Sequence, residues 1–269
     1  MSFETILFDQ REHVAIITLN RPDRLNAIST DLRSDVAAAV KDAHDDDGIR
    51  ALVITGVGRG FCSGADLSAV ASGVRGTLPE PTTQAGRLDE DGWVGRWAKM
   101  FHRFDKPVIA AVNGIAAGAG MSTALAADLR VGSEFARFKT VFIERSLSPD
   151  SGLSYFLPRI VGYARAADLI FTSRTVDAEE AYRLGLLDRL VAHDRLLEEA
   201  IKLANEMTQW PPLAMRMSKR VLQHNFEADI DDAMRYETVG LAMGRRASND
   251  VKEAMLAFSE KRKPKYTGS

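Results

Sequence analysis

The sequence predicts an α/β core followed by a helical C-terminal subdomain. Over residues 1–195, short apolar runs of strand character alternate with helical patterns, and over residues 196–269 only helical patterns remain. Two glycine-rich turns, at residues 58–66 and 113–120, each follow a strand and lead into a helix start. We therefore expect a core domain of residues 1–195 that carries the functional site. We expect residues 196–269 to form a helical subdomain, whose many apolar positions need to be covered either by its own core or by another subunit.

The first part of the core is expected to hold a hairpin, a capped helix and a buried strand. Apolar residues on both sides of a polar turn predict a hairpin of residues 5–8 and 14–19. Ser29 or Thr30 can cap the next helix, whose apolar positions recur at helical spacing. A strand follows at residues 51–55 and ends at the first glycine-rich turn.

Beyond that turn the expected elements continue to alternate. A short helix at residues 66–71 and a long mobile loop at 72–92, rich in Gly, Pro and Thr, come first. Residues 135–141 fit neither helix nor strand clearly. The other elements predicted for the core are helices at 93–104, 121–127, 153–160, 164–171 and 178–184, and strands at 108–112, 128–132 and 187–191.

Composition narrows the class of protein. The chain of 269 residues is 45% hydrophobic with a formal net charge of −2, which fits an ordinary globular protein and argues against a nucleic-acid partner. Cys62 is the only cysteine, so no internal disulfide can form. We find no signal peptide, no apolar segment long enough to span a bilayer and no metal-ligand spacing. We expect a cytoplasmic protein with no membrane, metal or nucleic-acid partner.

The two glycine-rich turns are the main candidates for a functional site. A strand, a glycine turn and a helix start leave backbone N–H groups without intrahelical partners. If the two turns lie together, two such donors can hold one developing negative charge, as in an oxyanion hole.

Two other functions fit parts of these turns. Gly114, Gly118 and Gly120 match the glycine spacing of short-chain dehydrogenases, but no tyrosine has a lysine four residues later, as that chemistry requires. Gly60-Phe-Cys-Ser-Gly64 matches the nucleophile elbow of hydrolases, with Cys62 as the nucleophile. Its partners would come from Asp150, Asp188, His193 or His224.

Several motifs together resemble those of the crotonase (enoyl-CoA hydratase/isomerase) superfamily. The motifs run through the whole chain in the expected order: Asn20-Arg-Pro22 with Asn26-Ala27, Gly60-Phe-Cys-Ser-Gly-Ala-Asp-Leu67, Lys106-Pro-Val-Ile-Ala-Ala-Val-Asn-Gly114, Gly118-Ala-Gly120, Pro149-Asp-Ser-Gly152, Leu157-Pro-Arg-Ile-Val-Gly162 and Phe258-Ser-Glu-Lys-Arg-Lys-Pro264. The resemblance implies a spiral of ββα units and an acyl-CoA thioester as substrate, with no further cofactor. It also implies a homotrimer or dimer of trimers built through the C-terminal helices.

The resemblance also implies the site residues. The oxyanion hole would use the N–H groups of Ala65 and Ala119. The position of Ala119 is commonly glycine in the family, and alanine is costly there only if the backbone needs a positive φ. Basic side chains would hold the nucleotide, with Lys261 supplied by a neighbouring subunit. The substrate-binding residues expected are Arg24, Ala27, Arg59, Ser63, Gly64, Asp66, Leu67, Gly118, Phe142 and Lys261.

The proton-transfer group differs from that of the family's hydratases. Those enzymes use two glutamates, and the corresponding positions here hold Ser122 and Phe142, which cannot act as bases. The remaining carboxylate is Asp150, in a Pro-Asp-x-Gly motif similar to that of 1,2-epoxyphenylacetyl-CoA isomerases. The alternative is that Asp150 only caps the helix beginning near Gly152. Whether His102 or Glu144 assists is left open.

The resulting prediction is double-bond isomerisation of an enoyl-CoA, with Asp150 as the single acid/base. Enoyl-CoA hydration is the alternative within the family. Dehalogenation, which also uses an aspartate at this position in 4-chlorobenzoyl-CoA dehalogenase, would require a histidine where Ala98 stands. A thiol hydrolase using Cys62 and a non-catalytic acyl-CoA-binding protein are the remaining interpretations.

Overall fold

The computed structural model describes residues 3–66 and 83–269. Its main sheet has six strands in the order β1-β2-β3-β5-β7-β9. The first pair is antiparallel and each later pair is parallel. The strands are β1 (Ile6–Arg11), β2 (Val14–Leu19), β3 (Ala51–Gly56), β5 (Val108–Val112), β7 (Leu129–Ser133) and β9 (Arg189–Val191).

A second sheet of three short parallel strands lies beside it, in the order β4-β6-β8. Its strands are β4 (Gly60–Cys62), β6 (Ile115–Ala117) and β8 (Arg137–Lys139). In the pairs β3/β4, β5/β6 and β7/β8, the first strand joins the large sheet and the second joins the small one. Helices follow each pair, because parallel neighbours need a crossover connection. This repeat confirms the expected crotonase-like spiral of ββα units.

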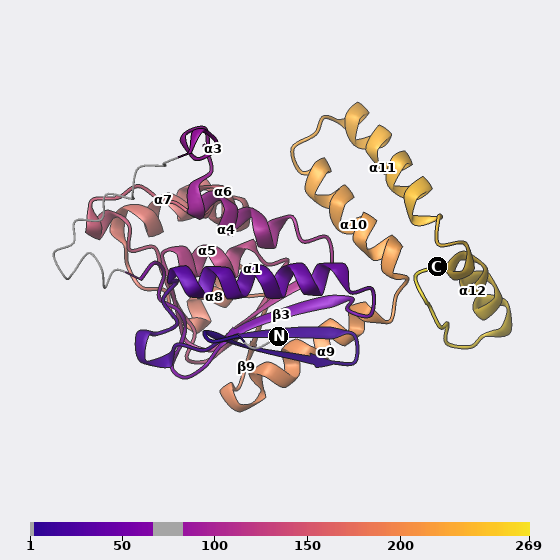
Figure 1. Ribbon diagram of the computed structural model, residues 1–269, viewed down its shortest axis with the longest axis horizontal. Helices are drawn as coiled ribbons and strands as arrows, with labels where there is room; N and C mark the ends of the chain where they lie inside the picture. Colours follow the sequence, from indigo (N-terminus) through magenta and orange to yellow (C-terminus); the bar gives the residue numbers. More distant parts are fainter. Residues whose placement is uncertain (1–2, 67–82) are drawn as a thin grey trace.

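The core helices cover the sheets on several sides (Figure 1). The first, α1 (Thr30–Asp45), is capped by Ser29, whose hydroxyl accepts from the N–H of Leu32. Every residue of α5 (Ala119–Ala126) is buried, so this helix lies inside the protein. The remaining helices of this part are η1 (Pro22–Arg24), α3 (Gln84–Arg87), α4 (Gly92–His102), η2 (Ile143–Arg145), α6 (Leu153–Val161), α7 (Tyr163–Thr172), α8 (Ala178–Leu184) and η3 (His193–Arg195).

Helix α9 (Leu196–Thr208) belongs to the core by its packing. Its buried side chains, such as Leu203 and Ala204, form one hydrophobic cluster with Val53 of β3 and Ile109 of β5. The expected domain boundary after residue 195 would separate this helix from the sheet that it covers. By packing, the core therefore extends through α9.

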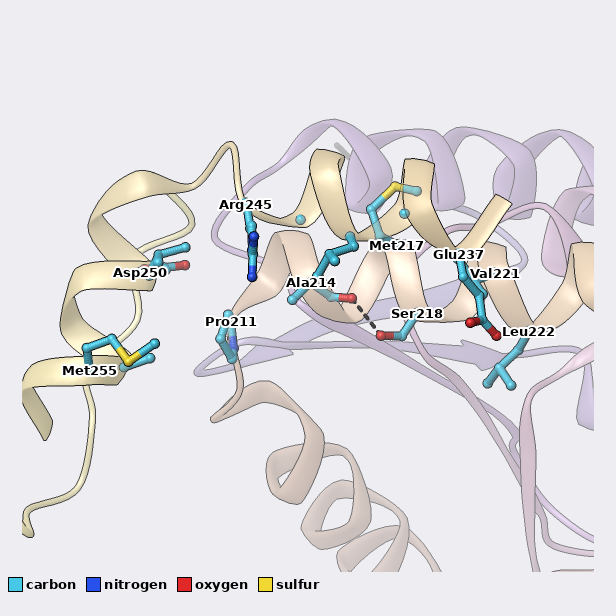
Figure 2. Close-up of a pocket in the computed structure, with 15 residues that line it drawn as sticks. Pro211, Ala214, Met217, Ser218, Val221, Leu222, Glu237, Arg245, Asp250 and Met255 are labelled. Atoms are coloured by element: carbon cyan, nitrogen blue, oxygen red, sulfur yellow. Dashed lines mark hydrogen bonds between the residues drawn. The ribbon is translucent and has the colours of Figure 1, made fainter. Parts of the chain in front are cut away.

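The last three helices project away from the core (Figure 1). They are α10 (Pro212–Asn225), α11 (Ile230–Gly244) and α12 (Ser248–Glu260). Polar contacts fasten α10 to the core: Arg216 donates to Asp105 at 3.0 Å, and Lys219 donates to Asp128 at 2.7 Å. A largely apolar groove of about 590 Å³ lies between the three helices (Figure 2).

Most expected elements are present with small shifts of their ends, and the differences lie near glycines. Residues 84–87 form a helical turn inside the segment expected to be a loop, with Thr83 accepting from Gly86 N–H. Strands β4 and β6 lie inside the glycine-rich turns, and β8 lies in the segment that fitted neither pattern. Apart from Asp66, the helix expected at 66–71 is outside the described residues, as is Leu67.

Candidate active site

The two glycine-rich turns meet in the small sheet. Gly60 pairs with Ile115, and Cys62 pairs with Ala116. A Cβ atom on Gly114 would lie 2.1 Å from the main-chain oxygen of Arg59, and one on Gly120 would lie 2.0 Å from that of Cys62. Both distances are far below van der Waals contact, so only glycine permits this approach of the two backbones.

The approach places the amides of Ala65 and Ala119 on neighbouring segments. Gly64, at φ +94°, lies so close that a Cβ on it would be 3.3 Å from the nitrogen of Ala119. The N–H of Ile28 donates to the oxygen of Gly64, and the oxygen of Ile28 accepts from the N–H of Asp66. The N–H of Ala65, which lies between these two bonds, therefore faces away from Ile28. Ala119 is the first residue of α5, so its N–H has no acceptor within the helix. Two amide donors placed in this way can hold one oxyanion.

Alanine at position 119 is compatible with this backbone. The positive φ in the second turn falls on Gly118, at +51°, and Ala119 is not among the described residues with positive φ. A Cβ at Ala119 therefore adds no backbone strain.

Asp150 lies beside the first turn of α5. The hydroxyl of Ser122, three residues after Ala119, is 3.4 Å from the main-chain oxygen of Asp150. The side chain of Asp150 is half-buried, and this burial raises the pKa of its carboxyl, against a smaller opposing effect of a hydrogen bond from Ser151. A carboxyl with a raised pKa is suited to taking up and returning a proton.

The interpretation of Asp150 as a helix cap is wrong. Helix α6 has Gly152 at its N-cap and no capping side-chain hydrogen bond. The main-chain oxygen of Asp150 accepts from Leu153 N–H at 2.9 Å, whereas its carboxylate accepts from the Ser151 hydroxyl at 3.0 Å. The carboxylate is thus not used to begin the helix.

Ser122 and Phe142, the residues expected at the places of the hydratase glutamates, are both buried. The Ser122 hydroxyl is 3.3 Å from the main-chain oxygen of Gly118. Phe142 faces the same glycine, since a Cβ on Gly118 would lie 3.8 Å from the Phe142 ring. The structure therefore puts a hydroxyl and a phenyl ring beside the second turn, and neither is a general base at neutral pH.

Glu144 and His102 are engaged elsewhere. Glu144 is exposed and forms a 2.7 Å ion pair with Lys139, and this contact lowers the pKa of Glu144. His102 packs against the rings of Tyr155 and Phe156, and burial lowers its pKa. Ala98, one turn before His102 on α4, faces the segment that contains Asp150. A Cβ on Gly152 would lie 3.1 Å from the Cβ of Ala98.

The interpretation of Cys62 as a nucleophile is wrong. Its side chain is fully buried, and desolvation raises the pKa of its thiol to about 12. A nucleophilic cysteine requires the thiolate and access to the substrate. Cys62 instead fills space below the junction of the two turns.

The other expected binding residues divide into three groups. Arg24 and Arg59 are both exposed. Their segments are adjacent, since the hydroxyl of Ser63, four residues after Arg59, donates to the main-chain oxygen of Arg24 at 3.3 Å. Asp66 forms a 2.8 Å ion pair with Arg21, which also donates to the oxygen of the buried Ala27. Lys261 ends α12, which Figure 1 shows well away from the core, so the structure does not bring it to the arginines within one chain.

Arg21 is a residue that sequence reasoning missed. It stands in the Asn20-Arg-Pro22 motif, but its position in a loop gave no sign of a partner 45 residues away. Its contacts with Ala27 and Asp66 tie the loop after β2 to the first glycine-rich turn. Arg21 therefore supports the segment that carries Ala65.

Comparisons with known proteins identify the family of the chain. A family model described as enoyl-CoA hydratase/isomerase matches residues 9–269. The chain belongs to this family. It is an enzyme of the crotonase superfamily, and this membership argues against a purely acyl-CoA-binding protein.

Similar proteins span the whole chain. It is 37% identical over 267 residues to a probable enoyl-CoA hydratase of Mycobacterium bovis, covering 99% of both chains. It is 35% identical to a short-chain-enoyl-CoA hydratase of Clostridium acetobutylicum, covering 98% of this chain and 97% of the relative. The crystal structure of an enoyl-CoA hydratase from Bacillus anthracis is similar at a TM-score of 0.89 and 30% identity, over 99% of this chain and all of the other.

The described residues contain no group of three or more His, Cys, Asp or Glu side chains that could hold a metal ion. None of the helices in this part of the chain is long and apolar enough to cross a membrane.

Proposed function

We propose that the protein isomerises the double bond of an enoyl-CoA, with Asp150 as the single acid/base and the N–H groups of Ala65 and Ala119 as the oxyanion hole. The family membership and the names of the relatives support an enoyl-CoA thioester as substrate. The observation that carries the choice of reaction is the position of Asp150: its main-chain oxygen lies 3.4 Å from the Ser122 hydroxyl of α5, and its carboxyl is half-buried. The resemblance implies that Ser122 and Phe142 take the places of the hydratase glutamates, and neither can act as a general base.

The reaction needs only one proton carrier. Asp150 takes a proton from C2 of a 3-enoyl-CoA, and the electron pair moves onto the thioester oxygen as an enolate. The two N–H groups stabilise that oxyanion, at roughly 2.7–4 kcal/mol per donor. Asp150 then returns the same proton to C4, which leaves the double bond between C2 and C3. No water is consumed, so no second carboxylate is required.

Hydration is the second candidate, and the names of the relatives favour it. In that reaction water adds to C3 and a proton to C2, so one group must activate the water and one must protonate carbon. Asp150 would have to do both, because Glu144 is paired with Lys139 and Ser122 has no basic group. This is why we place hydration second.

Binding of the nucleotide part is proposed to use cations from more than one segment. Arg24 and Arg59 are exposed on adjacent segments next to Ser63, close to the first glycine-rich turn. Lys261 would come from a neighbouring subunit of a homotrimer or dimer of trimers. The open apolar groove between α10, α11 and α12 supports such assembly, with exposed Leu222, Met255 and Phe258 nearby.

Product analysis in heavy-oxygen water separates the two reactions. The enzyme is incubated with several 2-enoyl- and 3-enoyl-CoA thioesters, and the products are identified by mass. Isomerisation moves the double bond without adding heavy oxygen, whereas hydration gives a labelled 3-hydroxyacyl-CoA. Labelled product formed faster than the isomer would overturn the proposal.

A further inference from the structure

Ser151, the residue after Asp150, has a backbone conformation that is rare for residues other than glycine. Ser151 is in the left-handed region, at φ +52°, and its side chain is only 2% exposed. Gly152, which follows, has φ +84°. A non-glycine residue in this region costs free energy. Glycine would adopt this backbone conformation at a lower cost in free energy. The conformation therefore does not explain why position 151 holds a serine.

The side chain of Ser151 has one specific use in the structure. Its hydroxyl donates to Oδ1 of Asp150 at 3.0 Å. A buried hydroxyl without a partner would be destabilising, and here the partner is the carboxylate of the neighbouring residue. Within the described part of the chain, Oδ2 of Asp150 accepts no hydrogen bond.

We propose that Ser151 is a positioning residue for Asp150: its hydroxyl fixes Oδ1, so that Oδ2 is left to take the proton from the substrate and return it. The inference rests on the proposed role of Asp150 and adds a residue to that site. A carboxyl group with one oxygen held has a defined rotamer. Oδ2 can then reach C2 and C4 of the substrate in turn without reorientation of the side chain.

The hydrogen bond also sets when Asp150 is ionised. It stabilises the carboxylate and lowers the pKa of Asp150, whereas burial raises it more strongly. Helix α5 carries no titratable side chain. The titratable side chains of the other helices around this segment are Arg96, Lys99 and His102 of α4, Tyr155 and Arg159 of α6, and Tyr163, Arg165 and Asp168 of α7, and none of them is a cause of the shift.

The test compares Ser151→Ala and Ser151→Gly with the parent enzyme. Both remove the hydroxyl, but Gly also relieves the backbone at positive φ. In both variants the acidic limb of the kcat/KM profile should move to higher pH. On the acid side of that limb kcat/KM should fall on the order of tenfold, with unchanged binding of a saturated acyl-CoA. Ser173→Ala is the matched control, because Ser173 is also buried and left-handed, at φ +50°.

A direct titration keeps the test independent of turnover. The Asp150 carboxyl can be followed by carbon-13 NMR of the full-length protein, with its signal assigned by loss in Asp150→Asn. Its pKa should rise in both Ser151 variants and stay unchanged in Ser173→Ala. An unchanged Asp150 pKa, or a shift in Ala but not in Gly, would overturn the role of Ser151. Failure of the proposed reaction would show separately, as full turnover in Asp150→Asn.

Discussion

Gly64 and Ala119 come from segments 55 residues apart, yet a Cβ on Gly64 would lie 3.3 Å from the amide nitrogen of Ala119 and 2.8 Å from the oxygen of Ala117. Gly64 also has φ +94°. The spacing of the two amides at 65 and 119 therefore depends on the absence of a side chain at 64.

Gly64→Ala should lower kcat strongly, because the added methyl group pushes the two segments apart and moves a donor away from the oxyanion. Loss of one such donor costs roughly 10²–10³-fold in kcat. Steady-state kinetics with an enoyl-CoA would measure it. Gly162→Ala is the matched control: it has φ +81° but nothing within 4 Å of its Cβ position. It should lose stability and keep turnover, and an equal loss of turnover in both variants would contradict the account.

Cys62 should be chemically inert in the native enzyme, because it is buried and its thiol pKa is about 12. A thiol reagent such as dithionitrobenzoate is expected to label the protein only after unfolding, and Cys62→Ala should keep turnover within a few fold. Rapid labelling of the native protein with loss of activity would restore the hydrolase interpretation.

Glu144→Gln is expected to leave kcat and KM almost unchanged, because the Glu144 carboxylate is exposed and paired with Lys139. Lys139→Met is a useful companion variant, since it removes the ion pair of Glu144 but keeps its carboxylate. A large loss of kcat in Glu144→Gln alone would mean that this carboxylate reaches the substrate and that the reaction uses two carboxylates.

Burial of Asp150 predicts that Asp150→Asn loses activity without losing stability. Because its folded-state pKa is raised, the folded protein binds this proton more tightly than the unfolded chain does. The resulting contribution to stability is present below the unfolded pKa and is lost as pH rises through the folded pKa. Asp150→Asn should therefore match or exceed the parent in thermal stability at pH 7, which calorimetry can measure. A clear loss of stability would point to a structural role instead.

Much of the fold followed from local patterns, and what was missed depends on long-range contacts. Ser29 and the spacing of Leu32, Val36 and Val40 were enough to predict α1. The sequence predicts turns where β4 and β6 lie, because three residues among glycines show no strand pattern until the two segments pair with each other. The sequence predicts α9 as part of the C-terminal helical subdomain, because the pattern of its apolar face does not reveal that it packs on the sheet.

The site could be located from the sequence only in part. The two glycine-rich turns pointed to amide donors, and the structure places those turns together. The contacts of Arg21 with Asp66 and of Ser122 with Asp150 join distant segments, so no motif contains them. The ion pair of Glu144 with Lys139 is also invisible in the sequence, because Lys139 lies in the segment 135–141, which fits neither a helix nor a strand pattern.

The most direct test of the central claim is turnover by Asp150→Asn with a 3-enoyl-CoA substrate, measured beside acyl-CoA binding by calorimetry. The variant is isosteric, and the carboxylate does not cap α6, so the fold should be kept. We expect the isomerisation rate to fall roughly 10²–10⁴-fold, as for removal of a general acid/base, with acyl-CoA affinity nearly unchanged. Turnover equal to that of the parent enzyme would contradict the assignment of Asp150 and with it the proposed reaction.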